Sequence, residues 1–335
     1  MTPNPHISVL LPVRNAAATL DEALQSLSSQ TFRDFEIVAV DDGSSDGTGA
    51  LLEEWSLRDK RIKFVTSSPR GIVDALNTAA QRARAELLAR MDADDVAAPD
   101  RFELQVDFMN DNPDIAACGT CVRYVPPEAV RDGARRYEEW INSVITSNDI
   151  ERDLFVECPI PHPSLMIRRV AFESAGGYRN VGWPEDYDLI LRLWQGGCRF
   201  GKVDQVGVYW RERPDRLSRI DARYSQAAFR RCKAHFIRDR LGGRQVAICG
   251  AGPVGKSFAL ALQELGCEIA AFVDFDPRKI GQMIHGAPVI HPSRVETLRG
   301  CYAVAAVGSA DARQSIRAML HDAGWTEPDD CCAVA

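Results

Sequence analysis

The sequence Leu87-Leu88-Ala89-Arg90-Met91-Asp92-Ala93-Asp94-Asp95 places three carboxylates directly behind an apolar run. The apolar run predicts a buried strand that ends where the acids begin. If the extended pattern continues, Asp92 and Asp94 point to one side and Asp95 to the other. Carboxylate oxygens are preferred ligands of Mg²⁺ and Mn²⁺, and such a cation commonly bridges them to a diphosphate. A solvated acidic turn at the surface is the alternative interpretation.

Apolar runs and amphipathic segments alternate before this stretch. We expect strands at residues 7–11, 35–40 and 62–65, a helix capped by Thr19, and helices at 48–57 and 72–84. This alternation predicts an α/β fold, with a mostly parallel sheet flanked by helices. Ligands of such sheets bind beyond the carboxyl ends of the strands, where Pro12, Asp41 and Asp92 fall. The sequence therefore predicts a single site at that edge.

Three motifs at these strand ends carry a family resemblance. They read Leu11-Pro12-Val13-Arg14-Asn15, Val40-Asp41-Asp42-Gly43-Ser44-Ser45-Asp46-Gly47-Thr48 and Ala89-Arg90-Met91-Asp92-Ala93-Asp94-Asp95. Over residues 7–218, the chain resembles the family 2 glycosyltransferases in the order and spacing of these motifs. The resemblance implies a GT-A fold, a nucleotide-sugar donor, a divalent cation and usually inversion at the anomeric carbon.

The resemblance also implies roles for individual residues around the nucleotide. Pro12 and Val13 would line its pocket, and Asp42 or Asp41 would receive the base. The other nucleotide-sugar-binding candidates are Asn15, Ser44, Asn77, Asp92 and Arg211.

For the cation, the resemblance implies that Asp94 binds Mn²⁺ or Mg²⁺ in an Asp-x-Asp motif, with Asp92 as a second ligand facing the ribose or sugar. Two positions depart from the family pattern. Arg14 stands where many members have Tyr, and Arg213 stands at the usual His position. The departure at Arg213 weakens any assignment of a histidine metal ligand.

A second acidic motif opens a helix and reads Trp183-Pro184-Glu185-Asp186-Tyr187. Proline and acids are ordinary at a helix start. Sugar transfer to a hydroxyl also needs a general base, which the Glu-Asp pair supplies in the family. The resemblance assigns that role to Asp186, with Glu185 as the second catalytic candidate. His162 lies in a proline-rich loop, where contact with a diphosphate or acceptor and an ordinary hydrogen-bonded role both stay open.

Two further segments bear on the acceptor. Residues 126–147 show mixed charge and no clear period, and we expect them to be mobile and to face the acceptor. Segment 211–244 has eleven basic and four acidic residues, and its apolar stripe comprises Tyr224, Ala228, Cys232 and Phe236. Such a helix can lie on anionic lipid, which would suit a lipid-linked acceptor, or pack on its own domain. Both alternatives stay open.

A second α/β unit follows Gly242-Gly243. Its first strand precedes a stretch that fits both G-x-G-x-x-G and G-x-x-x-x-G-K-S, Gly250-Ala251-Gly252-Pro253-Val254-Gly255-Lys256-Ser257. Either pattern places phosphate at Gly250, Gly252 and Gly255, with Asp274 as a ribose-binding or metal-side acid. A glycine turn needed only for packing is the alternative. The segment resembles small Rossmann-like domains found with sugar-modifying enzymes, and we expect domains at 1–240 and 243–335.

Composition narrows the class of protein. The chain has 335 residues and a net charge of −7, which argues against general nucleic-acid binding. Residues 1–6 do not resemble a signal peptide, and no apolar run reaches the ~18 residues of a membrane span. We expect a cytoplasmic protein, with the inner face of the membrane as a further location if segment 211–244 binds lipid.

These observations favour an inverting, metal-dependent glycosyltransferase. It would move a sugar from a nucleotide-diphosphate sugar to a glycan or lipid-linked acceptor, for cell-surface polysaccharide or glycoconjugate synthesis. The alternative is a nicotinamide-dependent oxidoreductase acting through the C-terminal domain, although that domain lacks an obvious catalytic Tyr-Lys or His pair. A non-catalytic sugar-nucleotide sensor is a third interpretation, against which the full set of carboxylates counts.

Overall fold

A computed structural model describes residues 4–335 and divides them into two compact units. The first contains the chain up to Ile150 together with Pro159–Val181 and Glu185–Ile220. The second contains Glu151–Cys158, Gly182–Pro184 and Asp221–Ala335. The main boundary between the units thus lies between Ile220 and Asp221, before the predicted residue 240, and two short inner segments also belong to the second unit. The first three residues of the opening segment lie outside the described residues.

Within residues 4–335, the sheet of the first unit has eight strands in the order β3-β2-β1-β4-β7-β6-β8-β5. The parallel strands on one side are β1 (Ile7–Val13), β2 (Phe35–Asp41), β3 (Ile62–Thr66) and β4 (Leu87–Arg90). The remaining strands are β5 (Val96–Ala97), β6 (Ile115–Val125), β7 (Met166–Arg168) and β8 (Arg199–Arg211). The predicted mostly parallel GT-A type sheet is confirmed, and the carboxyl ends of β1, β2 and β4 lie at one edge.

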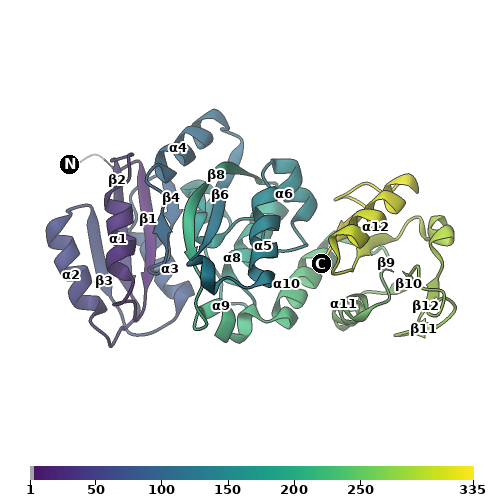
Figure 1. Cartoon of the computed structure of the whole chain (residues 1–335). Coiled ribbons are helices and arrows are strands. Elements are labelled where there is room, and N and C mark those ends of the chain that lie inside the picture. Colours follow the sequence, from purple (N-terminus) through teal and green to yellow (C-terminus); the bar gives the residue numbers. More distant parts are fainter. Residues whose placement is uncertain (1–3) are drawn as a thin grey trace. The chain divides into compact units, whose positions relative to one another are not determined.

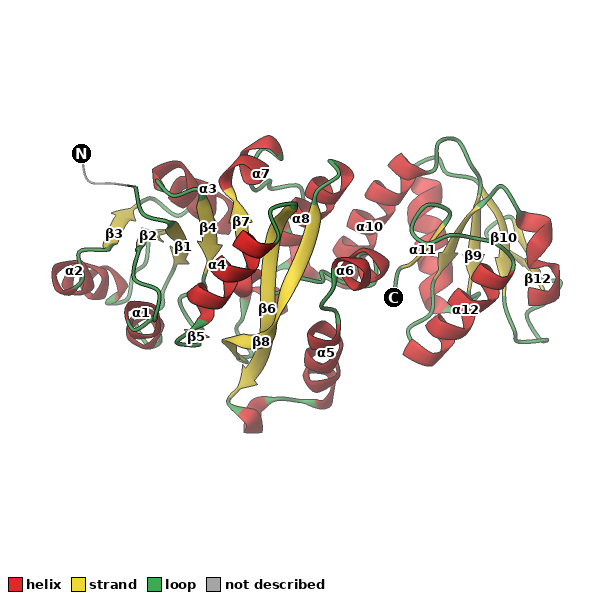
Figure 2. Ribbon diagram, turned by 90° about the horizontal axis from the view of Figure 1, so that it is seen from above, coloured by secondary structure: helices red, strands yellow, loops and turns green. Residues whose placement is uncertain are grey.

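Helices cover both faces of this sheet. Helices α1 (Leu20–Ser28) and α2 (Thr48–Arg58) lie on one face of β1–β3 and α3 (Ile72–Arg82) on the other (Figure 2). Alternate residues of β1, such as Val9 and Leu11, belong to the same buried cluster as Leu24 of α1. The further helices are α4 (Arg101–Asp111), α5 (Asp132–Ser143), α6 (Ser147–Asp153), α7 (Arg169–Ser174), α8 (Glu185–Gln195) and α9 (Leu217–Ile220).

Helix α5 corrects one expectation, because residues 126–147 contain three turns of regular helix. Its buried contact is narrow: Ile141 packs with Val122 and Val208, while Tyr137 and Trp140 are only partly buried. Ala134, Tyr137, Trp140 and Ile141 nevertheless recur at helical spacing, so the segment does have an apolar period. Our interpretation of residues 126–147 as a segment without a clear period was therefore wrong.

Within residues 4–335, the sheet of the second unit has six strands in the order β11-β12-β10-β9-β13-β14. Five of them are parallel, namely β9 (Val246–Cys249), β10 (Ile269–Val273), β12 (Ala287–Ile290), β13 (Tyr302–Ala305) and β14 (Cys331–Ala333). Strand β11 (Met283–Ile284) is antiparallel to β12. Helices α11 (Pro253–Glu264) and α12 (Ala310–Asp322) lie on opposite sides of this sheet (Figure 1). The arrangement is doubly wound and Rossmann-like.

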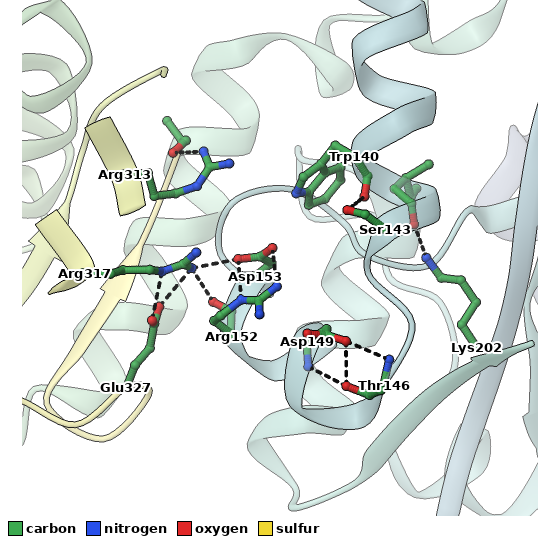
Figure 3. A network of polar contacts seen from close by, with 12 residues as sticks. Trp140, Ser143, Thr146, Asp149, Arg152, Asp153, Lys202, Arg313, Arg317 and Glu327 are labelled. Carbon is green, nitrogen blue, oxygen red and sulfur yellow. Dashed lines mark hydrogen bonds and ion pairs between the residues drawn. The ribbon is translucent and has the colours of Figure 1, made fainter. Parts of the chain in front are cut away.

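Polar contacts hold the inner segment 151–158 in the second unit. Arg317 donates to Asp153 at 2.7 Å and pairs with Glu327 at 2.9 Å (Figure 3). Lys233 of α10 (Gln226–Arg240) is buried and donates to the carbonyl oxygens of Val156 and Val334 at 2.7 and 3.0 Å. These contacts explain why α10 belongs to the second unit.

The apolar stripe of the basic segment is largely buried. Ala228, Cys232 and Phe236 are each at most 3% exposed, so these three side chains do not form an outward apolar face for a lipid surface. Among residues 4–335, no helix combines the length and apolar character needed to cross a bilayer.

Candidate functional site

The acidic loop after β4 brings its three carboxylates together. Strand β4 ends at Arg90, and one carboxylate oxygen from each of Asp92, Asp94 and Asp95 lies within 4.8 Å of the others. The expectation that Asp95 points to the opposite side was wrong. Alternation holds only while the backbone stays extended, and here the strand ends at Arg90 and the chain turns at Ala93 and Asp94.

Crowding and burial make this cluster suited to a cation. Asp95 is 1% exposed; its Oδ1 accepts a hydrogen bond from the Arg211 amide at 2.8 Å, and its buried Oδ2 has no hydrogen-bond partner. Burial and the Asp92 carboxylate raise the pKa of Asp94, and burial with both neighbours raises the pKa of Asp95 well above its usual value. A divalent cation relieves such repulsion and uses oxygen ligands. The residues present therefore fit Mg²⁺ or Mn²⁺.

The backbone of the acidic loop is held by side chains from three other elements. Thr19 does not cap α1 with its side chain; its hydroxyl donates to the Ala93 carbonyl at 3.0 Å. Arg211 Nε donates to the Asp94 carbonyl at 2.8 Å, and its guanidinium also pairs with Glu22. Arg101, which is fully buried, donates to the Arg90 carbonyl at 2.8 Å. Arg211, a predicted nucleotide-sugar ligand, thus supports the carboxylates in this structure.

Asp41 is the last residue of β2 and Asp42 follows it, and both are buried. Asp42 accepts hydrogen bonds from the amides of Arg70 and Gly71 at 2.7 and 2.8 Å, which fixes the start of α3. Asp41 Oδ1 accepts from the Ser44 amide at 2.9 Å. Each carboxylate thus shapes the loop around the predicted nucleotide pocket.

The remaining nucleotide candidates tie neighbouring loops together. The backbone N–H of Asn15 donates to the Ser44 hydroxyl at 2.8 Å, which joins the loop after β1 to the loop after β2. Pro12 is half-buried and Val13 is buried at the end of β1. Asn77 clamps the main chain of Tyr178 through hydrogen bonds of 2.9 and 3.0 Å. Because both ends of its side-chain amide are engaged, we do not carry Asn77 into the proposed donor site.

A second cluster forms around the start of α8. His162, in the 3-10 turn η2 (His162–Ser164), has its Nδ1 3.9 Å from Glu185 Oε1 and 4.0 Å from Asp186 Oδ2. Its Nε2 lies 2.9 Å from the Tyr178 hydroxyl oxygen. Glu185 is buried, whereas the Asp186 side chain is 20% exposed. Of the two carboxylates, Asp186 is the one that a substrate can reach.

The electrostatics keep His162 neutral at pH 7. Burial and the nearby Arg90 guanidinium hold the pKa of His162 well below its usual value, and burial raises the pKa of Tyr178. Tyr178 therefore keeps its proton, and its hydroxyl can donate a hydrogen bond to Nε2 of His162. The single ring N–H of His162 is then on Nδ1 and faces the two carboxylates.

Arg90 and Tyr178 link the two clusters, and sequence reasoning missed both. Arg90 is 3% exposed, and its guanidinium forms an ion pair with Asp92. The Asp92, Glu185 and Asp186 carboxylates all raise the pKa of Tyr178, after the larger effect of burial. The signal for Arg90 was its position, because it is a buried charged residue at the end of an apolar strand. Tyr178 gave no comparable signal.

Two more arginines lie near the acidic loop. Arg213 and Arg216 both act to lower the pKa of Asp94, against burial and Asp92. Arg216 stacks over Trp210, with 4.5 Å between the guanidinium carbon and the ring centre, and is largely buried. Arg213 is more exposed and pairs with Asp215 at 2.7 Å. Their positive charge suits an anionic group bound at the acidic loop.

The predicted phosphate loop of the second unit has a Rossmann geometry. Helix α11 begins at Pro253, so Lys256 lies inside the helix and is exposed. A P-loop lysine instead follows the loop at the helix start, so the G-x-x-x-x-G-K-S interpretation was wrong. Asp274 accepts hydrogen bonds from the Ala251 amide at 2.7 Å and from Lys279 at 2.9 Å. It thereby fixes the loop that carries Gly250 and Gly252, whereas Gly255 lies in the first turn of α11.

Comparison with known proteins identifies the family. The sequence pattern described as glycosyl transferase family 2 matches residues 8–176, which is half of the chain. The chain belongs to this family. It is 31% identical over 202 residues to the amylovoran biosynthesis glycosyltransferase AmsE of Erwinia amylovora, covering 59% of this chain and 73% of AmsE. It is 26% identical over 245 residues to the O-antigen biosynthesis glycosyltransferase WbnJ of Escherichia coli, covering 72% of this chain and 91% of WbnJ.

Solved structures agree on the fold. TarS of S. aureus, in complex with UDP-GlcNAc, superposes with a TM-score of 0.55 at 19% identity, covering 69% of this chain and 66% of that chain. The mannosyltransferase PcManGT of Pyrobaculum calidifontis, in complex with GDP-Man and Mn²⁺, superposes with a TM-score of 0.50 at 22% identity, covering 71% of this chain and 63% of that chain. This family 2 chain is a glycosyltransferase with a GT-A fold, and the oxidoreductase alternative receives no support.

Proposed function

We propose that the first unit transfers one sugar from a nucleoside-diphosphate sugar to a hydroxyl group of a growing cell-surface glycan, with inversion. The observation that carries this proposal is that Asp92 of the crowded carboxylate cluster and the Glu185–Asp186 pair all act on Tyr178, while Arg90 pairs with Asp92. The names of AmsE and WbnJ support a polysaccharide as the product. A lipid-linked glycan is the acceptor we favour for such a pathway.

The donor would bind between the acidic loop and the loops after β1 and β2. Pro12, Val13 and the Asp41–Asp42 turn would surround the base and ribose, and the complexes of TarS and PcManGT support a nucleotide-sugar donor. Asp94 would hold a Mn²⁺ or Mg²⁺ ion, with Asp92 and Asp95 as neighbouring oxygen donors. Such a cation, when bound, supplies positive charge to the departing diphosphate.

Transfer then needs a base on the opposite side of the sugar. Asp186 would accept the proton of the acceptor hydroxyl as its oxygen bonds to the anomeric carbon, and the electron pair of the old bond leaves with the diphosphate. Arg213 and Arg216 would stabilise the charge on that leaving group. The buried Glu185 and neutral His162 would hold Asp186 in position.

A thermal-unfolding panel of UDP-, GDP-, ADP- and TDP-sugars, with Mn²⁺ and with EDTA, tests the donor site. We expect at least one nucleotide sugar to raise the unfolding temperature only when Mn²⁺ is present. That donor should then be transferred or slowly hydrolysed by the wild type, and Asp94→Asn should lose both effects. A donor that stabilises Asp94→Asn as strongly as the wild type, in EDTA as well as Mn²⁺, would contradict the metal site.

A further inference from the structure

A cavity of about 550 Å³ lies within the second unit, at the carboxyl ends of β9, β10 and β13. Its lining comes from residues 250–316. The strand order reverses between β9 and β13, because β10 and β12 extend the sheet to one side and β13 and β14 to the other. Ligands of doubly wound sheets bind in the crevice at this reversal. The candidate catalytic carboxylates belong to the other unit.

Two glycines that line the cavity, Gly252 and Gly308, have no explanation in the packing of the chain. A Cβ at Gly250 would lie 2.7 Å from Val307, and one at Gly255 would lie 1.8 Å from the Gly250 carbonyl oxygen, so both positions need glycine. At Gly252 a Cβ would meet no atom within 4 Å, and its φ of −87° suits any residue. Gly252 lines the cavity and precedes α11, whose first N–H groups have no acceptor within the helix. Bare backbone there allows a phosphate to approach those N–H groups.

The rest of the cavity suits a flat ring. Val273, Ala306, Val307 and Ile316 give it an apolar wall, and Phe275 stands at the same cavity with 59% of its surface exposed. An exposed aromatic ring at the edge of a cavity offers a stacking surface for a base. Asp274, which precedes Phe275, accepts a hydrogen bond from the Ala251 amide, which precedes Gly252. This hydrogen bond joins the segment that carries Phe275 to the glycine loop.

We propose that the second unit binds a nucleoside diphosphate, with its phosphates at Gly252 and the start of α11 and its base against Phe275. This site is additional to the donor site of the first unit and does not depend on it. Lys256 takes no part, because it lies on the exposed side of α11.

Isothermal titration of the full chain with ADP, UDP and GDP in EDTA tests the proposal, with NAD and UDP-sugars in further arms. We expect one nucleotide per chain. Gly252→Asp should weaken binding by about tenfold or more, because it places a carboxylate beside the phosphate, and Phe275→Ala should weaken it by a similar factor through lost stacking. Lys256→Ala is the matched control on the same helix and should bind as the wild type does.

The titrations with different nucleotides distinguish two classes of nucleotide ligand. Preference for ADP and NAD identifies a dinucleotide site, and preference for UDP and UDP-sugars identifies a nucleotide-sugar site; both support the proposal. Gly252→Ala, whose Cβ enters open space, provides a folded variant if Gly252→Asp is unstable. The proposal is overturned if no nucleotide binds below about 1 mM. It is also overturned if binding persists in Gly252→Asp and Gly252→Ala but is lost in Asp94→Asn.

Discussion

Replacing Asp95 by Asn should stabilise the protein when no divalent cation is present. Asp95 Oδ1 accepts a hydrogen bond from the Arg211 amide at 2.8 Å, and Oδ2 is buried without a partner. Asn keeps the accepting oxygen and presents an N–H group where Oδ2 lies. The substitution therefore removes one of three like charges and adds a donor at the buried Oδ2 position.

The size of the gain follows from the spacing of the carboxylates. Two unit charges 4.8 Å apart repel by about 3 kcal/mol at an effective dielectric constant of about 20. Burial and the two neighbours already raise the pKa of Asp95, so proton uptake relieves part of this repulsion. We therefore expect a net gain of about 1 kcal/mol, which corresponds to roughly 2–4 °C in the unfolding temperature of a unit of about 200 residues.

Thermal unfolding in EDTA and in Mn²⁺ gives a readout that does not need activity. Wild type should gain about 2.7 kcal/mol when Mn²⁺ is about 100-fold above its dissociation constant, and Asp95→Asn should lose most of that gain. Asp114→Asn is the control, because Asp114 is an exposed carboxylate paired with Arg199 outside the cluster. A variant that is less stable than wild type in EDTA and still gains fully from Mn²⁺ would refute the reasoning.

Three further predictions concern the base, the scaffold and the boundary between units. Asp186→Asn should lower turnover by ~10²-fold with donor affinity unchanged, whereas the buried Glu185→Gln should cost less; steady-state kinetics with the identified donor will show the order. Glu36→Gln should cost about 2–3 kcal/mol of unfolding free energy at pH 7 and less than half of that at pH 3, measured by urea unfolding. The reason is that hydrogen bonds from Lys63 and Arg84 outweigh burial and lower the pKa of Glu36 to about 2, so its contribution is complete above pH 4.5 and is lost as the pH falls toward 2. A chain ending at Arg240 should unfold at a lower temperature than the full chain, and equal temperatures would contradict the assignment of α10 to the second unit.

The alternation of strand and helix was predictable because each has its own apolar period. The runs at residues 7–11 and 35–40 are buried on both faces of a parallel sheet, so they read as continuous apolar segments. The carboxyl ends of parallel strands meet at one edge, so the strand pattern alone places Asp42 and Asp92 near each other. Helix α5 was missed although Ala134, Tyr137, Trp140 and Ile141 recur at helical spacing, because the charged residues between them obscured that period.

The details of the site depend on turns and on long-range packing, which sequence periods do not encode. Asp95 joins the other carboxylates because the chain turns after Arg90, and Tyr178 reaches His162 because Asn77 of α3 clamps its main chain. Neither contact follows from local spacing.

The neutral state of His162 matters for the proposed base. A charged imidazole 4.0 Å from Asp186 would stabilise the carboxylate and make it a weaker proton acceptor. Burial and Arg90 oppose that charge, and Arg90 is itself held by Asp92. The same arginine thus neutralises part of the acidic loop and keeps the imidazole uncharged beside Asp186. Together with burial, one guanidinium would therefore serve both the proposed cation-binding cluster and the proposed general base.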